Sequence, residues 1–260
     1  MPDTTPATAR PTLPIVYGVP FSQPVRAVTW LLLNRGLPFE PVLTIPGSAG
    51  RSGSRHPDFL AKNPAGTVPV YEEPDTGLVI AEAHAIMTYL CNRHGWHDLY
   101  PAEAARRSRV DWYLHYHHRN IREASVALVA PRIRKDLAIP EAAQQAALAT
   151  FTRALDALEN GWLARSPFLA GEAPTLADIA ACVDIGQLQP RYTRLLDFAP
   201  WPRVRAWLEA MTRLDGYDEV HVPLAVLGDV SGEPPPMEAI REANLRGLDA
   251  VRARLAKIAG

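Results

Sequence analysis

Residues 14–45 read PIVYGVPFSQPVRAVTWLLLNRGLPFEPVLTI, and this stretch decides the fold of the first third of the chain. Its opening run, 14–18, is short, apolar and rich in residues that favour strands. Residues 24–35 carry apolar side chains at helical spacing, with a proline in the first turn and Gly36 directly after the last. Residues 38–45 then alternate as a strand does. The stretch therefore predicts a strand, a helix and a second strand.

A hairpin and a helix extend this unit. The strand-like runs 68–71 and 77–81 are separated by EEPDT, which is typical of a turn. The helical period returns at residues 82–93, and Gly95 ends it. The order βαβ followed by ββα predicts an α/β domain built on a small mixed sheet, which we place at residues 13–95.

The remainder of the chain is predicted to be helical. It divides into a linker at 96–102, an all-helical domain at 103–228, and a polar spacer with a last helix at 229–260. That helix carries an apolar stripe that should pack against another surface, and it is a candidate lid over a binding site. Residues 1–12, which are polar and rich in Pro and Thr, are expected to form a flexible tail. The helical stretches before the spacer are 103–130, 140–165, 175–189 and 201–213.

The segment PTLADI, at 174–179, is the strongest local signal in the helical domain. Thr175 and Asp178 have the spacing of a capping box, with Asp in place of the usual Glu or Gln. This pattern predicts a well-defined helix start that contributes roughly 1 kcal/mol. A structural role is sufficient to explain it, so we assign it no catalysis.

Composition excludes several classes of function. The formal net charge of −1 gives no general reason to expect a nucleic-acid or membrane partner. No run approaches the ~18 apolar residues of a membrane-spanning helix, and the N-terminus lacks the apolar core of a secretory signal. Cys91 and Cys182 lie far apart in apolar contexts, which predicts buried free thiols in a reducing compartment. We therefore expect a soluble, cytoplasmic protein.

Four segments resemble, in order and spacing, the cytosolic glutathione transferase family, and together they cover nearly the whole chain up to about residue 215. The serine followed by Gln-Pro, and the long C-terminus, most resemble the theta class and its bacterial relatives. The resemblance implies a thioredoxin-like N-terminal domain followed by an all-α C-terminal domain. The segments are FSQPVRAV (21–28), NPAGTVPV (63–70), IAEAHAIMTYL (80–90) and FLAGEAPTLADIA (168–180).

The family's chemistry requires the thiolate of glutathione, because an ordinary thiol with a pKa of about 8.5 is barely ionised at pH 7. The resemblance assigns Ser22 to the hydrogen bond that stabilises this thiolate, although the local pattern alone also fits a plain N-cap serine. It assigns Gln23 to holding glutathione; the alternative is an exposed residue of the first helical turn. Tyr17, a rival for the sulfur, is expected in the core or on the sheet surface.

The resemblance also implies where the rest of the tripeptide binds. Thr67 and Val68 match the segment whose backbone pairs with glutathione like an added antiparallel strand. Pro69 matches the family's cis-proline, against the alternative of a trans proline in an ordinary turn. Arg55, or Arg51 in the same loop, could reach the glycine carboxylate or simply be solvated.

The γ-glutamyl end is expected at the helix that begins near Glu82, where free N–H groups favour an anion and Glu82 can take the ammonium group. The family pattern here is Glu-Ser, whereas this chain has Ala83 after Glu82. The backbone N–H of Ala83 remains, but the lost hydroxyl predicts glutathione binding weaker by roughly 1.5–3 kcal/mol.

Residues of the helix that begins near 103 complete the predicted site. Asp111 matches the family's acidic residue that helps the glutathione site across a homodimer; otherwise it is an ordinary surface carboxylate. Tyr113, Tyr116 and His117 are candidates to line the electrophile pocket.

The run HYHH at 115–118 invites a metal hypothesis, because His115 and His118 are three residues apart. No carboxylate or cysteine completes a recognisable set of ligands, so we expect a polar helix that lines the cleft and no metal.

The sequence thus predicts a homodimeric glutathione transferase that activates glutathione for attack on a small hydrophobic electrophile, a class that includes halogenated compounds. Two alternatives remain open. One is a glutathione-dependent isomerase or disulfide reductase, and the other is a non-catalytic interaction protein that keeps the fold.

Overall fold

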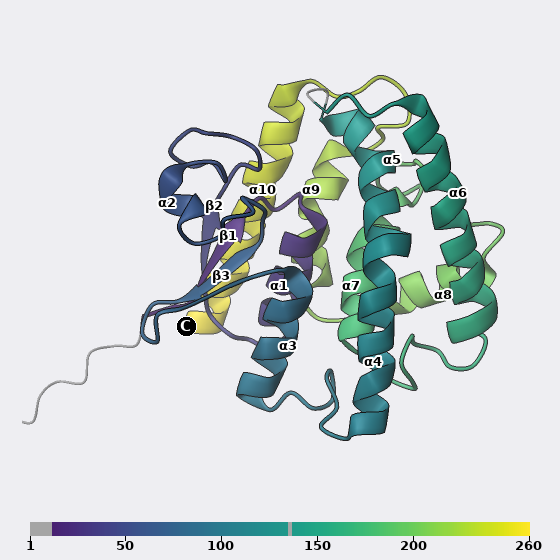
Figure 1. Ribbon diagram of the computed structural model, residues 1–260, viewed down its shortest axis with the longest axis horizontal. Coiled ribbons are helices and arrows are strands. Elements are labelled where there is room, and N and C mark those ends of the chain that lie inside the picture. The colour runs from purple at the N-terminus through teal and green to yellow at the C-terminus, as the bar shows by residue number, and fades with distance from the viewer. Residues whose placement is uncertain (1–11, 135–136) are drawn as a thin grey trace, which may run out of the picture.

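The computed structural model describes residues 12–134 and 137–260, and its N-terminal part is built on a four-stranded mixed sheet (Figure 1). The strand order is β2-β1-β3-β4, with β1 parallel to β2 and antiparallel to β3, and β3 antiparallel to β4. Residues 1–11 of the expected flexible tail lie outside the described residues. The strands are β1 (Ile15–Gly18), β2 (Glu40–Leu43), β3 (Val70–Glu73) and β4 (Leu78–Ala81).

Three helices belong to the same part of the chain: α1 (Gln23–Asn34), α2 (Pro57–Leu60) and α3 (Ala83–His94). The predicted order of strands and helices is confirmed. Figure 1 shows α1 and α3 between the sheet and the helical part of the molecule. Within α1 every residue except Pro24 and Asn34 is buried, because this helix is covered on more than one side.

Every named element of the described chain after β4 is helical, as predicted. The predicted stretch 103–130 is divided by a π-helical turn, η1. The helix α9, which contains Pro223, was not predicted. These elements are α4 (Ala104–His117), η1 (His118–Arg122), α5 (Glu123–Ile133), α6 (Glu141–Ala157), η2 (Leu158–Trp162), α7 (Leu176–Ile185), η3 (Gly186–Leu188), α8 (Pro202–Met211), α9 (Tyr217–Leu227) and α10 (Met237–Ala259).

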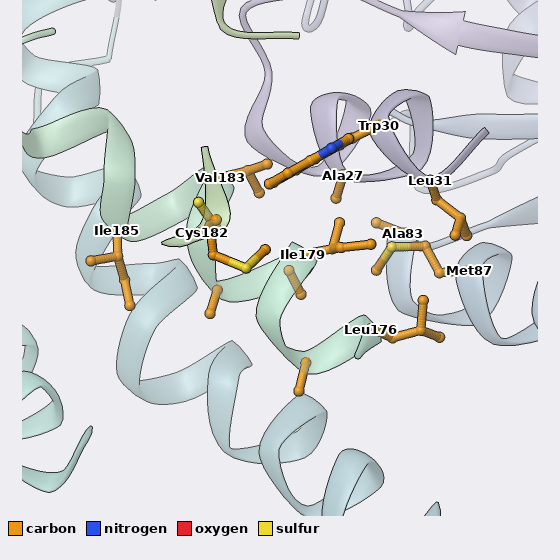
Figure 2. Close-up of a cluster of buried hydrophobic side chains, with 14 of the residues drawn as sticks. Ala27, Trp30, Leu31, Ala83, Met87, Leu176, Ile179, Cys182, Val183 and Ile185 are labelled. Atoms are coloured by element: carbon orange, nitrogen blue, oxygen red, sulfur yellow. The ribbon is translucent and has the colours of Figure 1, made fainter. Parts of the chain in front are cut away.

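The two parts of the chain share one hydrophobic core. Figure 2 shows side chains of α1, α3 and α7 pointing toward one another, among them Leu31, Met87 and Ile179. Cys182 lies in this cluster, and Cys91 is also buried with a free thiol, as predicted. Burial raises the pKa of each thiol to about 12, so both remain protonated and unreactive near pH 7.

The C-terminal helix α10 packs against α9 and β2 (Figure 1). The side-chain oxygen of Asn244 accepts a hydrogen bond of 2.9 Å from the backbone N–H of Phe21, in the loop between β1 and α1. Gly247 lies at the closest approach, since a Cβ atom there would be 2.4 Å from Pro223 and 2.9 Å from Pro20. A residue without a side chain therefore allows α10 to lie against that loop.

We expect Gly247→Ala to lower the free energy of unfolding by about 1–3 kcal/mol, because the added methyl overpacks this contact. The effect opposes the ~1 kcal/mol by which alanine favours a helix interior. Gly161→Ala in η2 is the matched control, since no atom lies within 4 Å of the Cβ position there. Chemical denaturation of both variants checks the prediction, and a gain in stability at both positions would contradict it.

Candidate functional site

A cavity of about 210 Å³ opens where the two parts of the chain meet. Its wall is formed by the first turns of α1 and α3, the segment before β3, the junction of α4 with η1, and α7. Both apolar and ionisable side chains line it, including Pro24, Val68, Ala83, His117, Arg122 and Asp184. This composition suits a ligand that has a polar end and an apolar end.

Ser22 stands at the N-cap of α1, two residues before Pro24 of the cavity wall. Its backbone is extended, and its side chain is half-buried and makes no capping hydrogen bond. The hydroxyl therefore lies at the positive end of the α1 dipole without the bond expected of a plain N-cap serine. Ser22 itself is not part of the wall of the cavity.

Gln23 is buried, so it is not the exposed first-turn residue that was one alternative. Its amide nitrogen donates to the side-chain oxygen of Gln187 at 3.0 Å, and its amide oxygen accepts from Arg122 at 2.8 Å. Arg26, one turn further along α1, donates to the carbonyl of Val183 at 2.8 Å. Gln23 thus joins α1 to η1 and η3, and the structure does not bring it to the cavity wall.

The peptide bond between Val68 and Pro69 is cis, as predicted. Thr67, Val68 and Pro69 all line the cavity. The side-chain nitrogen of Asn63 donates to the carbonyl of Thr67 at 2.9 Å and to its hydroxyl at 3.0 Å. These two hydrogen bonds hold the segment in place. The backbone of Val68 is thereby held at the cavity in an extended segment that leads into β3.

The N-terminus of α3 faces the same cavity. Glu82 is its N-cap residue, with a φ of 69° that is unusual for a residue with a side chain, and it lines the cavity together with Ala83. The free N–H groups of this first helical turn make a site for a carboxylate. Arg55, by contrast, is exposed and does not belong to the cavity wall.

The α4 candidates divide into one that lines the cavity and others that do not. His117 lines it, in the last turn of α4. Tyr113 is fully buried against Trp162, and Tyr116 packs on the same indole with ring centres 5.0 Å apart. Neither tyrosine belongs to the cavity wall, because α4 packs against Trp162 of η2 along its earlier turns and reaches the cavity only at its end.

Two further residues considered for the site, Asp111 and Tyr17, each make a side-chain hydrogen bond within the chain. Asp111 accepts a hydrogen bond of 2.8 Å from the hydroxyl of Tyr100, and burial together with this bond raises the pKa of Tyr100 to about 12. Tyr17 donates to Glu72 on the sheet surface at 2.7 Å, one of the two positions expected for it.

Family models match segments in both parts of the chain. Residues 16–98 match the N-terminal domain of glutathione S-transferases, and residues 141–210 match their C-terminal domain. Theta-2 glutathione S-transferase of Rattus norvegicus is 30% identical over 236 residues, which cover 86% of this chain and 94% of the relative. This chain belongs to the glutathione S-transferase family. The similarity to theta-class members confirms the theta-like assignment and the expectation of a glutathione transferase enzyme.

Other comparisons agree with this family. Glutathione S-transferase T2 of Arabidopsis thaliana is 31% identical over 222 residues, which make up 79% of this chain but 36% of that protein's length. The crystal structure of human theta-2, in complex with glutathione and an unknown ligand, superposes with a TM-score of 0.73 at 24% identity. The alignment covers 94% of this chain and 99% of that one, and it confirms the predicted fold class.

The transferase fold brings to the cavity three ionisable residues that the sequence did not single out: His84, Arg122 and Asp184. Asp184 is an acidic residue near the end of the otherwise apolar run 179–185 of α7, which is a signal that could have drawn attention to it. His84 follows Ala83 directly. Burial, together with the neighbouring His117 and His118, lowers the pKa of His84 to about 2, so its ring is neutral at pH 7.

The described residues contain no group of three or more His, Cys, Asp or Glu side chains arranged to hold a metal ion. Within the same residues, no helix has the length and apolar character that crossing a membrane requires.

Proposed function

We propose that this chain activates the thiol of glutathione and transfers the tripeptide to a small electrophile, by conjugation or, where the leaving group is a halide, by dehalogenation. The observation that carries the proposal is that Val68 and the N-terminus of α3 line one cavity. The first offers backbone groups for a peptide, and the second offers N–H groups for a carboxylate. Glutathione supplies both partners.

Ser22 would stabilise the thiolate in this reaction. A hydrogen bond to a charged acceptor contributes roughly 1.5–3 kcal/mol, and the dipole of α1 adds some tenths. Each 1.36 kcal/mol of preference for the thiolate lowers the thiol pKa by about one unit. Together these terms bring the pKa from about 8.5 to near or below 7. Ser22 acts as a hydrogen-bond donor here, while sulfur is the nucleophile.

Ala83 lacks the hydroxyl that a serine at this position would donate to a bound carboxylate. Ala83→Ser is expected to strengthen glutathione binding by roughly 10- to 100-fold, because it adds a hydroxyl donor to a carboxylate at the start of α3. Isothermal calorimetry measures the change. Ala85→Ser, at an exposed position of the same helix, is the matched control and should leave the affinity unchanged. Equal effects at both positions would rule out a carboxylate at this helix start.

Calorimetry of the unmodified protein with glutathione, followed by an assay panel, tests the proposed function. Conjugation of a model electrophile that requires glutathione supports a transferase. Reduction or isomerisation without a stable conjugate would instead support the alternative enzyme classes. The missing hydroxyl at Ala83 favours, as second candidate, a non-catalytic interaction protein, and no binding at millimolar glutathione would support it.

The proposal includes a homodimer, as the family resemblance implies. Trp112 on α4 is 58% exposed and packs beside Trp162 with ring centres 5.2 Å apart, so it presents an apolar surface that a second copy could cover. Asp111 is its neighbour on the same helix. Light scattering of the unmodified protein and of Trp112→Glu tests this part, and a monomer in both cases would refute it.

A further inference from the structure

His117 and Asp184 form a buried pair at the cavity. The Nε2 atom of His117 lies 3.1 Å from a carboxylate oxygen of Asp184, and the two side chains are 2% and 3% exposed. His117 comes from the end of α4 and Asp184 from α7, so the pair is held by two packed helices. Such rigid support is what a residue that transfers protons requires.

The carboxylate of Asp184 determines which ring nitrogen carries the proton. Burial alone would raise the pKa of Asp184, but Arg122 at 3.3 Å and the hydrogen bond from His117 lower it to about 2. An ionised carboxylate only accepts hydrogen bonds, so Nε2 of His117 donates. In the neutral ring, Nδ1 then keeps its lone pair.

That lone pair has no partner within the described residues: Nδ1 of His117 is buried and makes no hydrogen bond there. The nearby rings are His84, 5.2 Å away between ring centres, Tyr113 at 5.9 Å and His118 at 6.4 Å. Burial is the main cause that lowers the pKa of both neighbouring histidines, which keeps them from acting as fixed positive charges beside Nδ1. A buried acceptor without a partner in a cavity wall points to a ligand that donates to it.

We propose that His117, positioned by Asp184, is a catalytic residue that takes the proton of the glutathione thiol at Nδ1 and returns it to the electrophile. This inference rests on the proposed transferase function. The returned proton matters for electrophiles to which glutathione adds as a whole, of which an epoxide is one example.

The step balances without a further reactant. The S–H bond breaks, its electron pair stays on sulfur, and the proton binds Nδ1 of His117. Sulfur then forms a bond to one carbon of the epoxide, the C–O bond at that carbon breaks, and its pair stays on oxygen. Nδ1 returns the proton to this oxygen, which gives the hydroxyl of the product. Asp184 stabilises the intermediate imidazolium, as a buried carboxylate does for a histidine base.

Displacement of a halide does not need the second transfer, because the leaving group departs as an anion. Removal of His117 should therefore affect addition more than displacement. The two reactions can be compared on substrates of similar size, with styrene oxide for addition and benzyl chloride for displacement.

The experiment measures kcat on both substrates for the unmodified protein, His117→Gln and Asp184→Asn. General acid–base catalysis contributes about 10²- to 10⁴-fold, so turnover of styrene oxide should fall by at least about 100-fold in His117→Gln. Turnover of benzyl chloride should fall by about tenfold or less, since Ser22 still favours the thiolate. Asp184→Asn should change the ratio of the two rates in the same direction.

His115→Gln is the matched control, because this exposed histidine lies on the same helix outside the cavity wall. It should leave both rates unchanged. An equal loss on both substrates in His117→Gln and Asp184→Asn would show a structural role and overturn the assignment, as would no loss on either. An unmodified protein that conjugates neither substrate and binds no glutathione would overturn the proposed function itself, and this assignment with it.

Discussion

Ser22→Ala is expected to lower kcat for glutathione conjugation by roughly 10- to 150-fold, which corresponds to a lost hydrogen bond of 1.5–3 kcal/mol to a charged sulfur. The reason is geometric: the Ser22 side chain makes no capping bond at the start of α1, so its hydroxyl is available to the ligand. The stability of α1 should change little for the same reason. The thiol of bound glutathione should become less acidic in the variant.

Two measurements check this result. Steady-state turnover of a model electrophile gives kcat, and the ultraviolet absorbance of the thiolate, followed as pH rises, gives the pKa of bound glutathione. Ser108→Ala, on the exposed surface of α4, is the matched control and should change neither. Unchanged turnover in Ser22→Ala would remove Ser22 from the mechanism and leave the residues of the cavity wall to be considered.

The second large effect concerns stability. Asp178→Ala should lower the free energy of unfolding by about 3–5 kcal/mol, since a buried charged acceptor is removed and its donors are left without a partner. Asp178 is fully buried. It accepts hydrogen bonds from the backbone of Leu169 at 2.9 Å, from the backbone and hydroxyl of Thr175 at 2.9 and 3.0 Å, and from the indole of Trp207 at 2.9 Å.

Asp156→Ala separates burial from hydrogen bonding in that experiment. Asp156 also accepts from an indole, that of Trp201 at 2.8 Å, but it is exposed. Its loss should cost about 1 kcal/mol or less, because water replaces the exposed partner. Denaturant titration of both variants decides the question, and a similar loss in the two would mean that Asp178 does no more than cap one end of α7.

The capping box at Thr175 and Asp178 was predictable, because its residues are neighbours in the sequence and act within one helical turn. The same holds for the β1–α1–β2 unit and the hairpin, whose periodicity is local. The bonds that Asp178 receives from Leu169 and Trp207 were not predictable, since they depend on the packing of α7 against distant segments.

The residues of the site also divide into those that local sequence motifs predict and those that only the packing of helices brings together. Val68 and Ala83 were found because they lie in motifs of fixed spacing. His84 and Asp184 were missed, because their partnership with His117 is created by the packing of α3, α4 and α7. Tyr113 and Tyr116 lie outside the cavity wall for a related reason. A helix of known residues still has an unknown rotation relative to its neighbours until those neighbours are placed.

The burial of α1 has a consequence for how the chain unfolds. Its apolar side chains contact the sheet and also α7 and α9, so separation of the two parts would expose the face seen in Figure 2 to water. Neither part could then survive as an independent fragment. Thermal denaturation should therefore show a single cooperative transition, and limited proteolysis should yield no stable half-molecule.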